Sequence, residues 1–253
     1  MDGGGRMKFA QTATVAVILA IGMIASAGLI SKFLLKVRHE RVEAIEVKGY
    51  AGKNVLSDIG KFTCRFSAEG KTLKEAYDTL MKSQASVLAY FRQKGFGEKE
   101  ISIEAVNTNR VMMRDDKGKE TNEVHHYAAS QSVNVSSGNA ELIRSTSTSV
   151  TELIQGGVDI SADAPRFYVS DLKSIKLELL EAATRDGYDR ARILAQNSGG
   201  RVGTLISAEQ GVIQITERNS TDTSGGGVYD TSSIDKTAKV VVTLNYAVDN
   251  TKK

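Results

Sequence analysis

The 253-residue chain has little of the chemistry on which metal and redox sites depend. It contains one cysteine, Cys64, and three histidines. An intrachain disulfide is therefore excluded, and so is a cysteine cluster for zinc. Cys64 falls on the apolar face of a predicted strand together with Phe62 and Phe66. We therefore expect a buried core residue rather than a reactive thiol.

A large excess of charge of one sign is also lacking. The chain has 33 basic and 30 acidic residues, which leaves a formal net charge of +3. Proteins that bind nucleic acids need clustered lysine and arginine to neutralise phosphates. We therefore expect no nucleic-acid partner.

The familiar catalytic motifs are missing as well. The sequence contains no G-x-S-x-G, no phosphate-binding loop, no G-x-G-x-x-G and no H-E-x-x-H. The glycine-rich segment 199–203 follows a predicted helix and precedes a predicted strand, the reverse of the order that dinucleotide binding requires. His125 and His126 are neighbours on a predicted strand, so their side chains should point to opposite faces and not share a metal. We expect no catalytic, cofactor-binding or metal site and no enzymatic activity.

One long hydrophobic run is present, from Phe9 to Ser31, without a single ionisable side chain. As a helix it would extend roughly 34 Å, enough to cross the ~30 Å hydrocarbon layer of a bilayer. The run therefore favours a transmembrane signal-anchor helix over residues 9–35. A cytoplasmic tail at 1–8 would precede it, and a basic stalk at 36–41 would follow. The lipid bilayer is thus an expected partner.

A cleavable signal peptide is the competing interpretation of the same run. Arg6 and Lys8 provide its basic start, and Ala25-Ser26-Ala27 provides a small-residue cleavage site. The apolar stretch continues past Ala27, which favours the retained anchor. Flanking charge leaves the topology open, because the basic stalk favours a cytoplasmic body while long domains translocate largely regardless of charge.

Residues 42–249 show the patterns of an α+β body. Apolar residues alternate along several segments, which predicts mostly antiparallel strands, and recur at helical spacing along others, which predicts about three packed helices. Thr72 and Glu75 have the spacing of a capping box at the start of the first helix. The helices are expected over residues 72–94, 139–156 and 173–198. We expect one body, or two subdomains split near 157–170, and a tail at 250–253.

Three further segments of the body have informative compositions. The third helix has a stripe of mostly small residues, which predicts the closest packing of the three helices. The stripe is Leu180, Ala183, Gly187, Ala191 and Leu194. Residues 219–233 are rich in Ser, Thr, Asp and Gly and predict a mobile loop. Strong β-formers over 239–248 predict a strand that is central, or an edge protected by assembly.

Several stretches of the body, in this order and spacing, resemble the SIMPL-domain family. They are Val47–Ala51, Tyr127–Val133, Pro165–Lys173, Leu179–Thr184, Ala191–Gly203, Ser207–Thr216 and Val240–Tyr246. The resemblance implies a bacterial envelope protein, periplasmic or membrane-associated, with a link to oxidative-stress defence. Some members resemble large ring-like oligomers, so the resemblance implies such assembly as well. The family has no established catalytic residues, so none is carried over to this chain.

Together these observations predict a non-enzymatic, single-pass protein of the bacterial inner membrane. Its SIMPL-like body would lie on the periplasmic side and assemble into a homo-oligomer, with a ring among the expected forms. The alternative is a small-molecule-binding protein or an enzyme that uses a pocket between the two halves of the body. That alternative requires a deep cleft lined by converging polar groups.

Overall fold

The structure, a computed structural model, describes residues 22–23, 26–28, 30–32 and 43–250. The predicted tail at 1–8 and stalk at 36–41 lie outside these residues, as does most of the predicted transmembrane helix at 9–35. Among the described residues, no helix is both long enough and apolar enough to span a bilayer.

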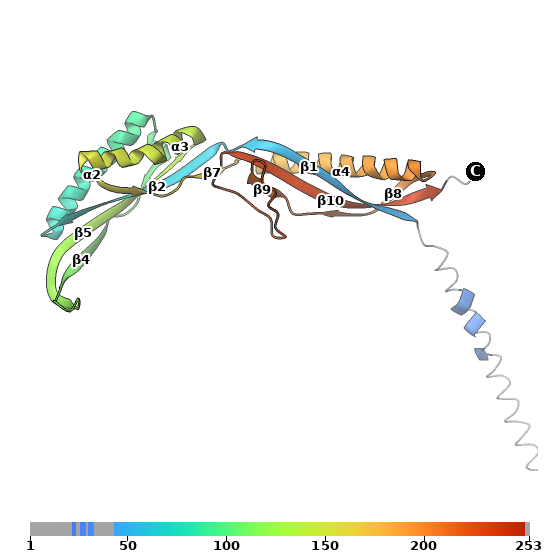
Figure 1. Cartoon of the computed structure of the whole chain (residues 1–253), viewed down its shortest axis with the longest axis horizontal. Helices are drawn as coiled ribbons and strands as arrows, with labels where there is room; N and C mark the ends of the chain where they lie inside the picture. The colour runs from blue at the N-terminus through green and yellow to red at the C-terminus, as the bar shows by residue number, and fades with distance from the viewer. Residues whose placement is uncertain (1–21, 24–25, 29, 33–42, 251–253) are drawn as a thin grey trace, which may run out of the picture. The chain divides into compact units, whose positions relative to one another are not determined.

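Residues 43–250 form an α+β body with two β-sheets (Figure 1). In the six-stranded sheet the order is β3-β5-β2-β6, with β4 also paired to β5 and β7 to β2, and these pairs are antiparallel. Its strands are β2 (Ile59–Gly70), β3 (Ile101–Ile103), β4 (Asn107–Arg114), β5 (Glu120–Ser137), β6 (Asp159–Ala162) and β7 (Arg166–Tyr168). The predicted class and the mostly antiparallel pairing are confirmed.

The four-stranded sheet has the order β1-β10-β8, with β9 also paired to β10. Its strands are β1 (Ala44–Leu56), β8 (Gly200–Gln210), β9 (Gln214–Glu217) and β10 (Asp235–Asn250). The C-terminal strand, predicted over 239–248, therefore lies in the middle of its sheet.

Three α-helices and two 3-10 helices lie within residues 43–250. They are α2 (Leu73–Lys94), α3 (Ala140–Ser149), α4 (Leu172–Asn197), η1 (Glu98–Glu100) and η2 (Val150–Gly156). The capping box is confirmed at the start of α2, where Thr72 accepts from the Glu75 amide, and Gly95 ends the helix with φ 99°. The helix expected over 139–156 is instead α3 followed by the tighter turns of η2.

Contacts divide the described chain into two compact units. The smaller unit contains residues 43–46, 191–207 and 245–250, and the larger contains 47–190 and 208–244. The subdomain boundary near 157–170 stays a prediction.

The core of the larger unit lies between the six-stranded sheet and two helices on one of its faces, α2 and α3 (Figure 1). Alternate residues of β2 are buried, and three of them, Phe62, Cys64 and Phe66, are at most 4% exposed. They face the apolar stripe of α2, where the Phe91 ring meets Phe62 edge to face at 6.0 Å between centroids. Burying each such ring contributes about 1.5–3 kcal/mol. The apolar residues at every second position of β2 and those at helical spacing along α2 thus pack together in one layer.

Helix α4 packs unusually close to strand β1. A Cβ added at Gly49 would lie 2.0 Å from the Ala183 carbonyl oxygen, and one added at Gly187 would lie 2.6 Å from Leu244 Cδ1. The small-residue stripe therefore permits the approach, as predicted. Its two end positions were wrong, because Leu194 is 50% exposed and Leu180 is only partly buried. The buried stripe is Leu179, Ala183, Gly187, Ala191 and Ala195.

Candidate functional site

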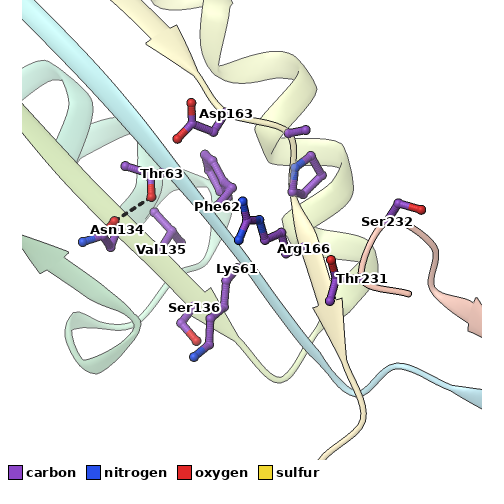
Figure 2. Close-up of a pocket in the computed structure, with 12 residues that line it drawn as sticks. Lys61, Phe62, Thr63, Asn134, Val135, Ser136, Asp163, Arg166, Thr231 and Ser232 are labelled. Carbon is purple, nitrogen blue, oxygen red and sulfur yellow. Dashed lines mark hydrogen bonds between the residues drawn. The ribbon is translucent and has the colours of Figure 1, made fainter. Parts of the chain in front are cut away.

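A groove of about 870 Å³ lies in the larger unit, at the end of β2 that pairs with β7 (Figure 2). Its walls come from β2, β5, the connection between β6 and β7, and a later loop. The lining residues are Lys61, Phe62, Thr63, Asn134, Val135, Ser136, Asp163, Ala164, Pro165, Arg166, Thr231 and Ser232. The residues that line this recess thus come from before, within and after residues 157–170.

Three of the lining residues form a row across neighbouring strands. Lys61 on β2 is the antiparallel partner of Ser136 on β5 and of Arg166 on β7. Side chains of directly opposed residues lie on the same face of a sheet, with Cβ atoms about 5 Å apart. Figure 2 shows Lys61 extending toward Ser136 and Arg166 extending from β7 toward β2. The register thus places two cationic residues and a hydroxyl residue in one row.

The next row of the groove is already satisfied by internal hydrogen bonds. The Thr63 hydroxyl donates to Asn134 Oδ1 at 2.6 Å, and Asn134 Nδ2 donates to Glu104 Oε1 at 2.7 Å. By contrast, the side chains of Lys61, Arg166 and Ser136 make no hydrogen bond or ion pair with any other residue that the structure describes. The Lys61 ammonium group lies over the Tyr168 ring, with Nζ 5.7 Å from the ring centroid. The free donors are therefore concentrated in the cationic row.

A buried ion pair holds the loop that closes one end of the groove. Lys236 is fully buried, and its Nζ donates to the Asp230 carbonyl at 2.7 Å and to Asp230 Oδ2 at 3.1 Å. Burial alone would raise the pKa of Asp230, but hydrogen bonds from Ser233, Ser232 and Lys236 outweigh it and hold the pKa far below its usual range. The loop carbonyl of Thr231 accepts from the Phe167 amide at 2.8 Å. Thr231 is thereby placed beside β7.

Much of the loop predicted as mobile, residues 219–233, is tied down by polar contacts. The Gln214 side chain donates to the Ser224 carbonyl and accepts from the Val228 amide, both at 2.8 Å. The Tyr229 hydroxyl accepts from the Val169 amide at 3.2 Å. The mobility of this loop stays a prediction, but several of its residues have fixed partners.

The two adjacent histidines do not point to opposite faces, so that prediction was wrong. Val111 pairs with His126 and Met112 pairs with Val124, which makes His125 the extra residue of a β-bulge. The bulge brings the two Nδ1 atoms within 2.6 Å of each other, and His126 Nε2 lies 3.4 Å from Glu69 Oε1. The described residues contain no group of three or more His, Cys, Asp or Glu side chains arranged to hold a metal ion.

Cys64 is a buried core residue, as predicted. It is fully buried on the core face of β2, and burial raises the pKa of its thiol to about 12. The thiolate that reactive cysteines use is therefore not available at neutral pH. The glycine-rich segment at 199–203 is also as predicted, because α4 ends before it, Gly199 has φ 81°, and β8 starts at Gly200.

Sequence reasoning did not find the groove. Lys61 and Arg166 are far apart in the sequence, and nothing around either residue indicates a binding motif. The only usable signal was the alternation along β2, which places Lys61 on the solvent face. The pairing with Arg166 depends on strand register, which a single sequence does not specify.

Comparison with known proteins gives the family without giving a function. Among curated proteins, none matches the chain. A family model described as SIMPL, a protein of unknown function (DUF541), matches residues 45–246. That match covers nearly the whole body and agrees with the resemblance drawn from its separate stretches. The chain belongs to the SIMPL family.

Proposed function

We propose that this chain is a non-enzymatic, single-pass protein of the bacterial inner membrane. Its body, on the periplasmic side, assembles into a homo-oligomer that serves envelope or oxidative-stress defence. The anchor rests on the uncharged run at 9–31, and the compartment and the stress link rest on the family resemblance. The assembly rests on one observation in the structure, the exposed edge strand β8.

Strand β8 lacks the protection that edge strands usually have. It is the last strand in the order β1-β10-β8, and every residue from Thr204 to Gln210 is exposed. Its sequence, GRVGTLISAEQ, contains no proline and no lysine. Leu205 and Ile206 are each 49% exposed. A long edge that exposes apolar residues and has neither proline nor lysine is a template for pairing with another chain.

A second copy of this chain fits that edge by symmetry. If β8 pairs with itself in antiparallel fashion about Leu205, Arg201 of each copy stands opposite Glu209 of the other. Neither side chain forms an ion pair within the described part of the chain. Opposite charges directly across an antiparallel pair stabilise it, and a two-fold interface forms each such pair twice. The charge pattern of the strand is therefore complementary to itself.

The proposal is tested on the full chain in its own membrane. We expect the chain in the membrane fraction after a high-salt wash, with an N-terminal sequence that extends upstream of Gly28. After detergent extraction, light scattering should give a protein mass that is a multiple of 27.3 kDa. Cells without the protein should be more sensitive to peroxide. A mature chain that starts at Gly28, or a detergent-extracted monomer at micromolar concentration, would contradict the proposal.

A second candidate function is the binding of a small molecule in the groove. It is favoured by the concentration of unpaired donors from β2, β5 and β7 around one recess of about 870 Å³. Ligand sites typically have volumes of about 300–1,000 Å³ and a few converging polar groups. This candidate does not exclude assembly, because it uses different residues.

A further inference from the structure

We propose that the groove binds a small molecule through a phosphate or carboxylate group, held between Lys61 and Arg166. The inference rests on the second candidate function and adds to it the chemical class of the ligand. Its starting point is the cross-strand pair that these two residues form.

Lys61 and Arg166 are like charges that face each other directly across β2 and β7. Like charges on directly opposed residues destabilise a sheet, because their Cβ atoms lie about 5 Å apart on one face. No carboxylate among the described residues lies within ion-pair distance of either side chain. An anion seated between them would replace this repulsion by two attractions.

The neighbouring groups are also suited to an oxyanion. Ser136 stands on the other side of Lys61 in the same row, and Thr231 lies beside β7. Both hydroxyls can donate, and neither side chain has a hydrogen-bond partner in the part of the chain that the structure describes. The guanidinium of Arg166 presents a planar fork of donors that matches two oxygens of a carboxylate or phosphate. Four residues that carry donors, from three strands and one loop, thus line the same groove.

The charges of the groove argue against a cationic ligand. Asp163 is the only carboxylate among the lining residues, against two cations. A metal ion would need several oxygen, nitrogen or sulfur ligands, and the row of free groups consists of donors. The groove also contains Pro165 and Ala164, which leaves apolar surface for the remainder of a ligand that has an anionic end.

The test is calorimetric titration of the full chain in a neutral detergent with four small probes. They are inorganic phosphate, citrate, choline and glucose. We expect saturable binding of phosphate or citrate, one per chain, and none of choline or glucose. Lys61→Met and Arg166→Met should each weaken that binding at least tenfold, because each removes a charge-assisted hydrogen bond.

Arg65→Met is the matched control. Arg65 lies on the same exposed face of β2 as Lys61, four residues along the strand, and pairs with Ser132 and Ser161. It does not line the groove. It removes the same charge from the same strand and should leave anion binding unchanged. Equal loss in all three variants would mean a general charge effect and would overturn the proposal.

Thermal unfolding separates a binding role from a structural one. Without added anion, Lys61→Met and Arg166→Met should unfold no earlier than the unmodified chain, because each relieves a like-charge contact. Phosphate should raise the unfolding temperature of the unmodified chain and not of these variants. Early unfolding of both variants without anion would assign the two cations to the fold and refute the binding role.

The four probes also separate the failure of the inference from that of the function beneath it. If choline or glucose bound and the anions did not, the groove would still be a ligand site but the anion assignment would fall. If none of the four bound, both the anion assignment and the small-molecule-binding function would be refuted. Vesicles of phosphatidylglycerol, compared with phosphatidylcholine, then identify the source of the anion. If the chain binds phosphatidylglycerol vesicles and Arg166→Met abolishes that binding, the anion is a lipid headgroup. If it binds free phosphate but not these vesicles, the ligand is soluble.

Discussion

Reversal of charge on β8 is the most direct test of assembly through that strand. In the pairing about Leu205, Arg201→Glu places two glutamates opposite each other at two symmetry-related positions. An opposite-charge pair across an antiparallel strand pair contributes about 0.2–1 kcal/mol, and a like-charge pair costs a similar amount. Taking about 0.5 kcal/mol for each term, the change is about 1 kcal/mol per position and about 2 kcal/mol per dimer. The dissociation constant should therefore rise about 30-fold.

The assay is sedimentation of the full chain in detergent over a range of concentrations. Arg201→Glu and Glu209→Arg should each weaken association, while the double variant should restore it, because the charges are then exchanged rather than lost. Arg110→Glu is the matched control, since Arg110 is an exposed arginine on β4. High salt should shrink the effect, since the pairs are exposed to solvent. The reasoning is refuted if the double variant associates as weakly as the single ones, or if Arg110→Glu has the same effect.

Three further predictions concern the body itself. Gly49→Ala should lower the unfolding temperature by about 5–10 °C, because the new Cβ would lie 2.0 Å from the Ala183 carbonyl oxygen, while Gly156→Ala, with open space around it, should change it little. Because the folded pKa of Asp230 is lowered, the contribution of this carboxylate to stability is complete above its unfolded pKa of about 3.9 and is lost as the pH falls. In urea unfolding, the stability of Asp230→Asn should therefore fall less with acid than that of the unmodified chain. With a thiol pKa of about 12, Cys64 should react with an aromatic disulfide reagent only after denaturation, with one thiol released per chain, and fast reaction of the native chain would contradict its burial.

The parts of the fold that depend on local chemistry could be predicted from the sequence. The capping box at Thr72 and the glycine stop at Gly95 are interactions between near neighbours, so their spacing alone indicates them. The core position of Cys64 follows from the period of two along β2. The close approach of α4 follows from small residues at four-residue spacing, although the choice of Leu179 over Leu180 as a buried position does not.

The parts that depend on strand register could not be predicted. The contact between His125 and His126 exists because one extra residue is inserted opposite Val111, and a bulge reverses the face of every residue beyond it. In a strand without a bulge, neighbouring residues point to opposite faces. The sequence does not show where an extra residue is inserted, so it favoured opposite faces for the two histidines. The groove was missed for a related reason, because β7 is only three residues long and its pairing with β2 is set by the fold around it.

Register also explains why net charge is a poor guide to what this protein binds. A net charge of +3 indicates no strong preference of the surface for anions or cations. However, the pairing of β2 with β7 places two cationic residues opposite each other in one recess. A like-charge pair inside a chain lowers stability, whereas an opposite-charge pair such as Arg201 with Glu209, which only a second copy could complete, adds to association. A bound anion would stabilise the first arrangement, and another copy of the chain would complete the second. Both conclusions follow from which residues stand opposite one another, and neither follows from how many charges the chain contains.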